Sequence, residues 1–204
     1  MNAKRALVVV LSLIALAGCS QGASTSGPPE SPTANSAGAG AALLADHNEA
    51  DVSFVTGMIP HHMQALMMVD LAAGKPQSPE FAQLLADVQA AQAPEIDQMS
   101  GWLQEWGEPV PEMMMDHGQA GDMDAGDGME GMLTGAEMTA LAATEGDAFE
   151  RAWLHAMVKH HRGAVKMAEA QLANGQHEGT LALAQAIVES QSAEIAYMRE
   201  LLGS

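Results

Sequence analysis

The chain has 204 residues, with 26 acidic side chains and 8 Lys or Arg, so its formal charge at pH 7 is −18. This acidic balance argues against binding to nucleic acid or to anionic membrane surfaces, and it favours the attraction of cations. The single cysteine, Cys19, excludes an intrachain disulfide and a thiolate metal site, so any soft ligands must come from the 16 methionines.

Residues 1–18 have the pattern of an export signal and should not contribute to the fold. Two basic residues precede an apolar run that is too short to span a bilayer, and the run ends in LAGC at 16–19. This ending resembles the lipobox of bacterial lipoproteins, which implies cleavage before Cys19 and attachment of diacylglycerol to its sulfur. An ordinary secretory peptide with a chance cysteine is the alternative. We therefore expect an exported protein, anchored by lipid on the outer face of the cytoplasmic membrane or in the periplasm.

The rest of the chain divides into a tether and one helical domain. Residues 19–44 are rich in Ser, Gly, Ala, Thr and Pro, which is typical of a flexible tether. Over 45–204 aromatic residues are few and β-branched runs are absent, so an all-α domain is expected. Four main helices are predicted over about 47–73, 79–106, 144–174 and 178–202, with a short helix over about 136–143. Pro60 should kink or break the first helix, and Pro94 should disturb the second.

The helical domain repeats itself at an offset of 99 residues. MIPHH at 58–62 recurs as MVKHH at 157–161, and QAPEIDQM at 92–99 recurs as QSAEIAYM at 191–198. The shared residues are largely Met, His, Gln and Glu, whereas a repeat that served packing alone would share mainly Leu, Val and Ala. Short links make each unit an antiparallel helical hairpin, and two such hairpins can close a four-helix bundle.

The repeated residues fall on one face of each helix, because an α-helix advances about 100° per residue. In a bundle these faces meet in the interior, where unpartnered polar groups would cost several kcal/mol in total, a cost that a bound metal or a closed hydrogen-bond network would remove. The candidate metal ligands are Met58, His61, His62, Met68, Met99, Met157, His160, His161, Met167 and Met198. Methionines that fill the core and histidines that are hydrogen-bonded are the alternative interpretation.

Four further residues are expected to support these ligands. Glu95 and Glu194 are interpreted as carboxylates that orient imidazole N–H groups. Gln92 and Gln191 are expected either to support the ligands or to pack between helices. His47, His155 and His177 lie off the repeated face and are expected at the surface.

The donor set favours copper over other metals. Thioethers are soft ligands that bind Cu(I) far better than hard cations, and imidazole suits both copper states. Cu(I) is therefore favoured, with Ag(I) as a chemical mimic. Zinc would prefer Cys or carboxylate ligands, and a di-iron centre needs Glu-x-x-His on paired helices, a motif that this sequence lacks.

The segment 107–132 between the two hairpins differs from the rest. It is rich in Gly, Met and acidic residues and has no Lys or Arg. We interpret it as a low-affinity copper collector, and a plain acidic loop is the alternative. Its candidate ligands are Met113, Met114, Met115, His117 and Met123.

The two motifs resemble a known family. The pattern Met-x-x-His-His-x-x-Ala-x-x-Met at 58–68 and 157–167, with Gln-x-x-Glu-Ile-x-x-Met at 92–99 and 191–198, is similar to the signature of the bacterial domain-of-unknown-function family numbered 305. The resemblance covers about residues 45–202. It implies an exported, ferritin-like four-helix bundle associated with copper binding and copper tolerance, with the ten candidate ligands as its functional residues. The second copy is closer to the family pattern, which leaves open whether both halves bind equally.

Together these features predict an extracytoplasmic protein that sequesters copper or hands it on. A copper exporter or chaperone is the expected partner, a homo-oligomer is an open option, and contact with the membrane is expected through the lipid alone. No nucleophile, acid–base pair or organic cofactor motif stands out, so the sequence indicates no enzyme. The alternatives are a metal-dependent oxidoreductase on a ferritin-like bundle and a metal-free interaction protein of the cell envelope.

Overall fold

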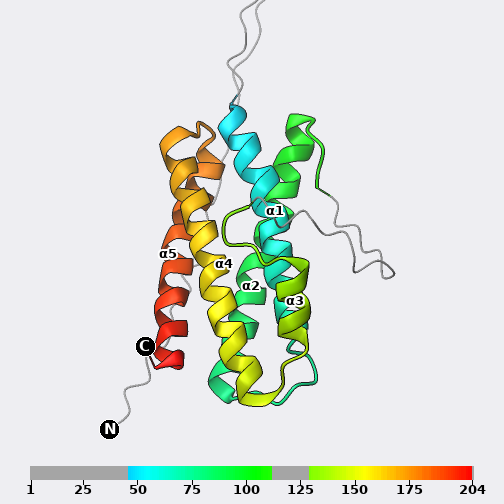
Figure 1. Ribbon diagram of the computed structural model, residues 1–204. Helices are drawn as coiled ribbons and strands as arrows, with labels where there is room; N and C mark the ends of the chain where they lie inside the picture. The colour runs from blue at the N-terminus through cyan, green and yellow to red at the C-terminus, as the bar shows by residue number, and fades with distance from the viewer. Residues whose placement is uncertain (1–45, 112–128, 204) are drawn as a thin grey trace, which may run out of the picture. The chain divides into compact units, whose positions relative to one another are not determined.

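The computed structural model describes residues 46–111 and 129–203, which contain five helices and no strand (Figure 1). The prediction of an all-α fold is confirmed, and α3 is the short helix expected before the third long one. None of the helices in these two ranges is both long enough and apolar enough to cross a membrane. The helices are α1 (Glu49–Asp70), α2 (Pro79–Trp106), α3 (Gly135–Ala142), α4 (Gly146–Asn174) and α5 (Glu178–Leu202).

Several predictions fall outside the described residues. These are the export signal over 1–18, the tether over 19–44, and the lipid attachment site at Cys19. The five proposed ligands of the 107–132 segment also lie there, namely Met113, Met114, Met115, His117 and Met123.

The four long helices form two hairpins, α1 with α2 and α4 with α5. The hairpins meet along α1 and α4, and α3 packs on α4. Local sequence explains the ends of these helices: Ser78 caps α2 ahead of Pro79, and Gly107 ends α2 in the left-handed conformation with a φ of 74°. The seam between α1 and α4 is therefore the place where the two copies of the repeat face each other.

The two internal prolines do not break their helices, so of the two expectations at Pro60, a kink or a break, the break is absent. Pro60 lies inside α1 and Pro94 lies inside α2, and both helices run through them without interruption. A proline inside a helix costs about 3 kcal/mol. Around Pro60 this cost is offset because apolar side chains beside it, such as Met58 and Ile59, are fully buried against the rest of the bundle.

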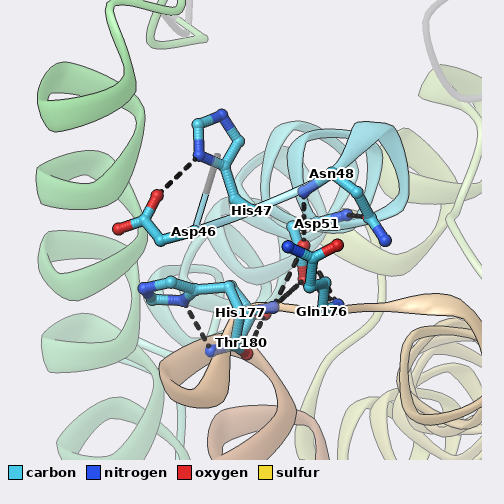
Figure 2. Close-up of polar contacts among 7 residues, drawn as sticks. All are labelled: Asp46, His47, Asn48, Asp51, Gln176, His177 and Thr180. Atoms are coloured by element: carbon cyan, nitrogen blue, oxygen red, sulfur yellow. Dashed lines mark hydrogen bonds and ion pairs between the residues drawn. The ribbon is translucent and has the colours of Figure 1, made fainter. Parts of the chain in front are cut away.

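A buried carboxylate ties the start of α1 to the turn between α4 and α5 (Figure 2). Asp51 accepts hydrogen bonds from the Thr180 hydroxyl at 2.7 Å and from the backbone N–H groups of Gln176 and His177. Burial acts to raise the pKa of Asp51, but hydrogen bonds from Thr180, Asn48 and other donors outweigh it and hold this pKa below its usual value. The carboxylate therefore stays charged in the interior because donors surround it.

Candidate metal centre

Two imidazoles meet at the seam between the hairpins. The rings of His61 on α1 and His160 on α4 have centroids 3.8 Å apart and planes inclined by 41°. Both side chains are fully buried, and none of their four ring nitrogens has a hydrogen-bond partner among the described residues. Each unpartnered polar group of this kind costs about 1–3 kcal/mol. The arrangement is therefore one that a ligand of the ring nitrogens would stabilise.

The environment keeps both rings neutral. Burial, together with a smaller effect of neighbouring His62, lowers the pKa of His61 to about 3. Burial also holds the pKa of His160 well below its usual value, with His61 contributing. The backbone of Glu130 lies beside His61 and opposes the shift, but it does not reach hydrogen-bond geometry with either ring nitrogen. A neutral imidazole is the form that binds a metal.

We expect the metal-free protein to lose stability as the pH falls from about 6.5 towards 3. A histidine whose pKa is lowered by folding contributes its full stability above the unfolded pKa and loses it as the pH falls to the folded pKa. In this window the unfolded chain binds protons that folded His61 and His160 exclude, at about 1.4 kcal/mol per pH unit for each histidine.

The measurement is the free energy of urea unfolding between pH 7 and 5, a range in which carboxylates such as Asp51 stay ionised. The matched control is the double variant His61→Leu with His160→Leu, which should lack this part of the pH dependence. An equal loss in the wild type and the double variant would contradict the prediction.

The second histidine of each pair contacts a carboxylate of its own hairpin. His62 Nε2 lies 2.6 Å from Oε2 of Glu95, and His161 Nε2 lies 2.6 Å from Oε2 of Glu194. A carboxylate accepts, so each Nε2 donates its proton, and in the neutral form of the ring each Nδ1 has a lone pair. Both Nδ1 atoms are buried without a partner. The two hairpins therefore present the same free nitrogen in the same way.

The methionines form two groups, and each member of one group corresponds at the 99-residue offset to a member of the other. The first, which we call the Met58 group, contains Met58, Met99 and Met167 within one hydrophobic cluster. The second, which we call the Met157 group, contains Met157, Met198 and Met68 within the other cluster. Five of the six are fully buried, and Met167 is partly buried.

This division is not apparent from the helical face alone. Met58 and Met68 share a face of α1, but they are ten residues apart, which is about 15 Å along a helix. One ion cannot contact both. The structure instead puts Met58 in a cluster with Met167 of α4, and Met68 in a cluster with Met157 of α4.

Two buried amides complete the repeated set. The exposed fractions of Gln92 and Gln191 are 2% and 3%, and the side-chain oxygen of each has no partner among the described residues. Within 46–111 and 129–203, no group of three or more His, Cys, Asp or Glu is arranged to hold a metal ion. The donors that the repeated set places in this interior are imidazoles, amides and thioethers, and a set that contains thioethers suits a soft ion.

The three histidines outside the repeated face have different surroundings. His155 is exposed, as predicted. His47 and His177 are half-buried against Trp106, with ring centroids 4.3 Å and 5.2 Å from it. These two are therefore surface residues that Trp106, at the C-terminal end of α2, covers in part.

Four buried polar residues are not among the repeated motif residues, namely Asp51, Gln64, Gln171 and Thr180. Asp51 was not predicted as an interior group, although the spacing Asn48-x-x-Asp51 is that of a helix capping box, which the structure contains. The capping signal marks the start of α1. It gives no indication that the same carboxylate also binds the α4–α5 turn.

The fold and interior define a duplicated helical bundle with paired buried histidines and two thioether groups. The chain belongs to the family described as "Domain of unknown function (DUF305)", which matches residues 51–202. The resemblance found in the motifs is thereby confirmed.

Solved structures resemble this chain over most of its length. A DUF305 protein from Streptomyces coelicolor, named as a candidate secreted protein, is 34% identical, with 76% of this chain and 92% of that chain covered and a TM-score of 0.66. A DUF305 fragment from Deinococcus radiodurans is 31% identical, with coverages of 76% and 97% and a TM-score of 0.66. CopM in its Cu(I)-bound form is 32% identical, with coverages of 74% and 94% and a TM-score of 0.58. No curated protein matches this chain.

Proposed function

We propose that this protein binds copper outside the cytoplasm, holds it as Cu(I) inside the bundle, and stores it or hands it on. The observation that carries the proposal is the pair of buried imidazoles, His61 and His160, whose four ring nitrogens have no partner among the described residues. Imidazole with thioether is a donor set that suits Cu(I), with Ag(I) as its mimic. The similarity to CopM, which has been solved with Cu(I), Cu(II) and Ag, supports this choice.

The twofold division of the thioethers suggests two metal positions. We propose that the Met58 group serves one position and the Met157 group serves the other, with the imidazoles of His61, His62, His160 and His161 between them. Glu95 and Glu194 would keep the Nδ1 lone pairs of His62 and His161 directed at the metal. Gln92 and Gln191 would support the same rings from α2 and α5.

The cellular setting is part of the same proposal. Lipid attachment at Cys19 would hold the domain outside the cytoplasmic membrane, and the candidate secreted relative supports export. We propose no catalytic step, and a copper exporter or chaperone would exchange metal with the protein. The five candidate ligands Met113, Met114, Met115, His117 and Met123 would collect the ion at lower affinity.

We expect tight Cu(I) binding by the purified protein and a loss of about tenfold in affinity when Glu95 or Glu194 is replaced by Gln. A neutral amide cannot hold the N–H of the histidine as firmly as a carboxylate, and changes of this kind cost about 10–100-fold. Because the two His–Glu contacts have the same length, the two single variants should behave alike.

The measurement is an anaerobic Cu(I) titration in competition with a chromophoric chelator. Asp97→Asn is the matched control, because Asp97 is exposed on α2 two residues after Glu95. A wild-type protein that takes no Cu(I) from the chelator would contradict the proposal. Full affinity in both glutamate variants would contradict the role given to the carboxylates.

A further inference from the structure

Residues 129–133, which we call the strap, cross the seam between α1 and α4 just before α3 begins (Figure 1). Gln64 of α1 holds the strap by a pair of buried hydrogen bonds. Its side-chain N–H donates to the Leu133 carbonyl at 2.8 Å, and its side-chain oxygen accepts from the Leu133 N–H at 2.7 Å. The Gln64 side-chain amide therefore anchors the strap on α1 with one donated and one accepted hydrogen bond, as a neighbouring backbone segment would.

At the 99-residue offset, Gln64 corresponds to Gly163 of α4. Because Gly163 has no side chain, the strap lies directly against the α4 backbone. A Cβ at Gly163 would lie 1.9 Å from the Glu130 carbonyl oxygen, so no other residue fits without moving the strap. Gly131 has a φ of 90° and lies against the Gly163 Cα and the His160 carbonyl. An ion pair between Lys166 and Glu130 adds to this anchor. The strap thus lies on the turn of α4 that carries His160.

The strap brings one more thioether to one of the two methionine groups. A Cβ at Gly57 would lie 3.7 Å from Met129 Sδ and 3.1 Å from Met167 Cε, so both side chains reach the same point beside α1. Gly57 directly precedes Met58 and is one turn before His61. Met129 is therefore a neighbour of the Met58 group on the side of the paired imidazoles.

The repeat gives the Met157 group no counterpart of Met129. The counterpart of Gly57 is Ala156, which already carries the methyl group that Gly57 lacks. The residue 99 positions before Met129 is Glu30, which has no sulfur. The strap therefore breaks the symmetry that the duplicated helices would otherwise impose.

We propose that Met129 adds a thioether ligand to the Met58 group, so that the two positions are unequal and a soft monovalent ion fills the Met129 side first. An added thioether raises affinity for Cu(I) and Ag(I) because these ions prefer soft ligands. The inference rests on the proposed function, since it needs metal in the bundle. It also identifies the strap as the segment that covers the seam imidazoles.

The test is a calorimetric titration of the purified full chain with Ag(I) alone. The wild type should show a tighter and a weaker step within the bundle. Met129→Leu, which keeps the volume of the side chain, should weaken the tighter step by about tenfold or more and leave the weaker one unchanged. The NMR signal of the Met129 methyl group should shift with the first equivalent of Ag(I).

Two further variants separate the thioether from general effects on packing. Met132→Leu is the matched control, because Met132 is also half-buried in the strap but is not among the atoms nearest to Gly57. Gly163→Ala keeps every thioether and favours the helix by about 1 kcal/mol, yet its methyl group would displace the strap. It should weaken the same step as Met129→Leu.

The outcomes distinguish a failure of the role given to Met129 from a failure of the proposed copper-binding function. Equal steps in the wild type, or a Met129→Leu titration that matches the wild type, would overturn the role of Met129. If the double variant His61→Leu with His160→Leu then fails to bind, the proposed function still stands. A wild type that takes up no Ag(I) in the bundle would overturn both proposals.

Discussion

Replacing both seam histidines by leucine, His61→Leu with His160→Leu, is expected to abolish tight Cu(I) binding and to stabilise the metal-free protein. The two rings supply four buried nitrogens that have no partner in the described residues, so without metal they are a cost. We expect the affinity to fall by at least about a hundredfold, which corresponds to about 3 kcal/mol. The free energy of unfolding without metal should rise by about 1–3 kcal/mol, because an apolar side chain of similar size replaces an unsatisfied polar one.

Both effects can be measured on one preparation, by chelator competition for Cu(I) and by urea unfolding without metal. His155→Leu is the matched control, since His155 is exposed on the same helix as His160. Tight binding that survives in the double variant would move the metal to the methionines of the 107–132 segment. A large loss of stability without metal would show that the two histidines serve packing, as the metal-free alternative requires.

The substitution Asp51→Asn is expected to lower the free energy of unfolding by about 3 kcal/mol. The carboxylate accepts from the Thr180 hydroxyl, from the Gln171 side chain and from two backbone N–H groups of the α4–α5 turn, all of them donors. An amide would direct its own N–H groups at some of these donors and leave them unpartnered. Hydrogen bonds to a charged group are worth about 1.5–3 kcal/mol each, and buried donors without an acceptor add to the loss.

Urea unfolding at pH 7 measures this effect, and Asp70→Asn is the matched control because Asp70 is exposed at the other end of α1. Copper affinity offers a second readout. The Asp51 network lies at the end of the bundle, away from the paired imidazoles, so the folded variant should bind Cu(I) as the wild type does. A loss of less than about 1 kcal/mol would contradict the role of Asp51 as the link between the hairpins.

Local patterns in the sequence were enough to locate the helices. The helical pattern of the sequence predicted the four long helices to within about three residues of their observed ends. Helix formation depends mainly on residues three or four positions apart, which one sequence displays. The break that was one of two expectations at Pro60 does not occur, because burial of its apolar neighbours offsets the local cost of a proline.

The sequence also identified the residue types of the candidate site. The 99-residue repeat and the helical face placed the two histidine pairs and their methionines in the interior, and the structure buries all four imidazoles. The carboxylates expected to orient imidazole N–H groups do lie against His62 and His161. Whether these residues bind metal remains the prediction that the titrations test.

Only the tertiary structure decided which of these residues meet. The packing of α1 against α4, two segments about 100 residues apart, brings His61 and His160 together at the seam. The same packing groups Met58 with Met167. The Asp51 network and the strap over Gly163 are likewise contacts between distant segments. A sequence pattern records the face on which a side chain lies, but the partner of that face is set by the packing free energy of the whole bundle.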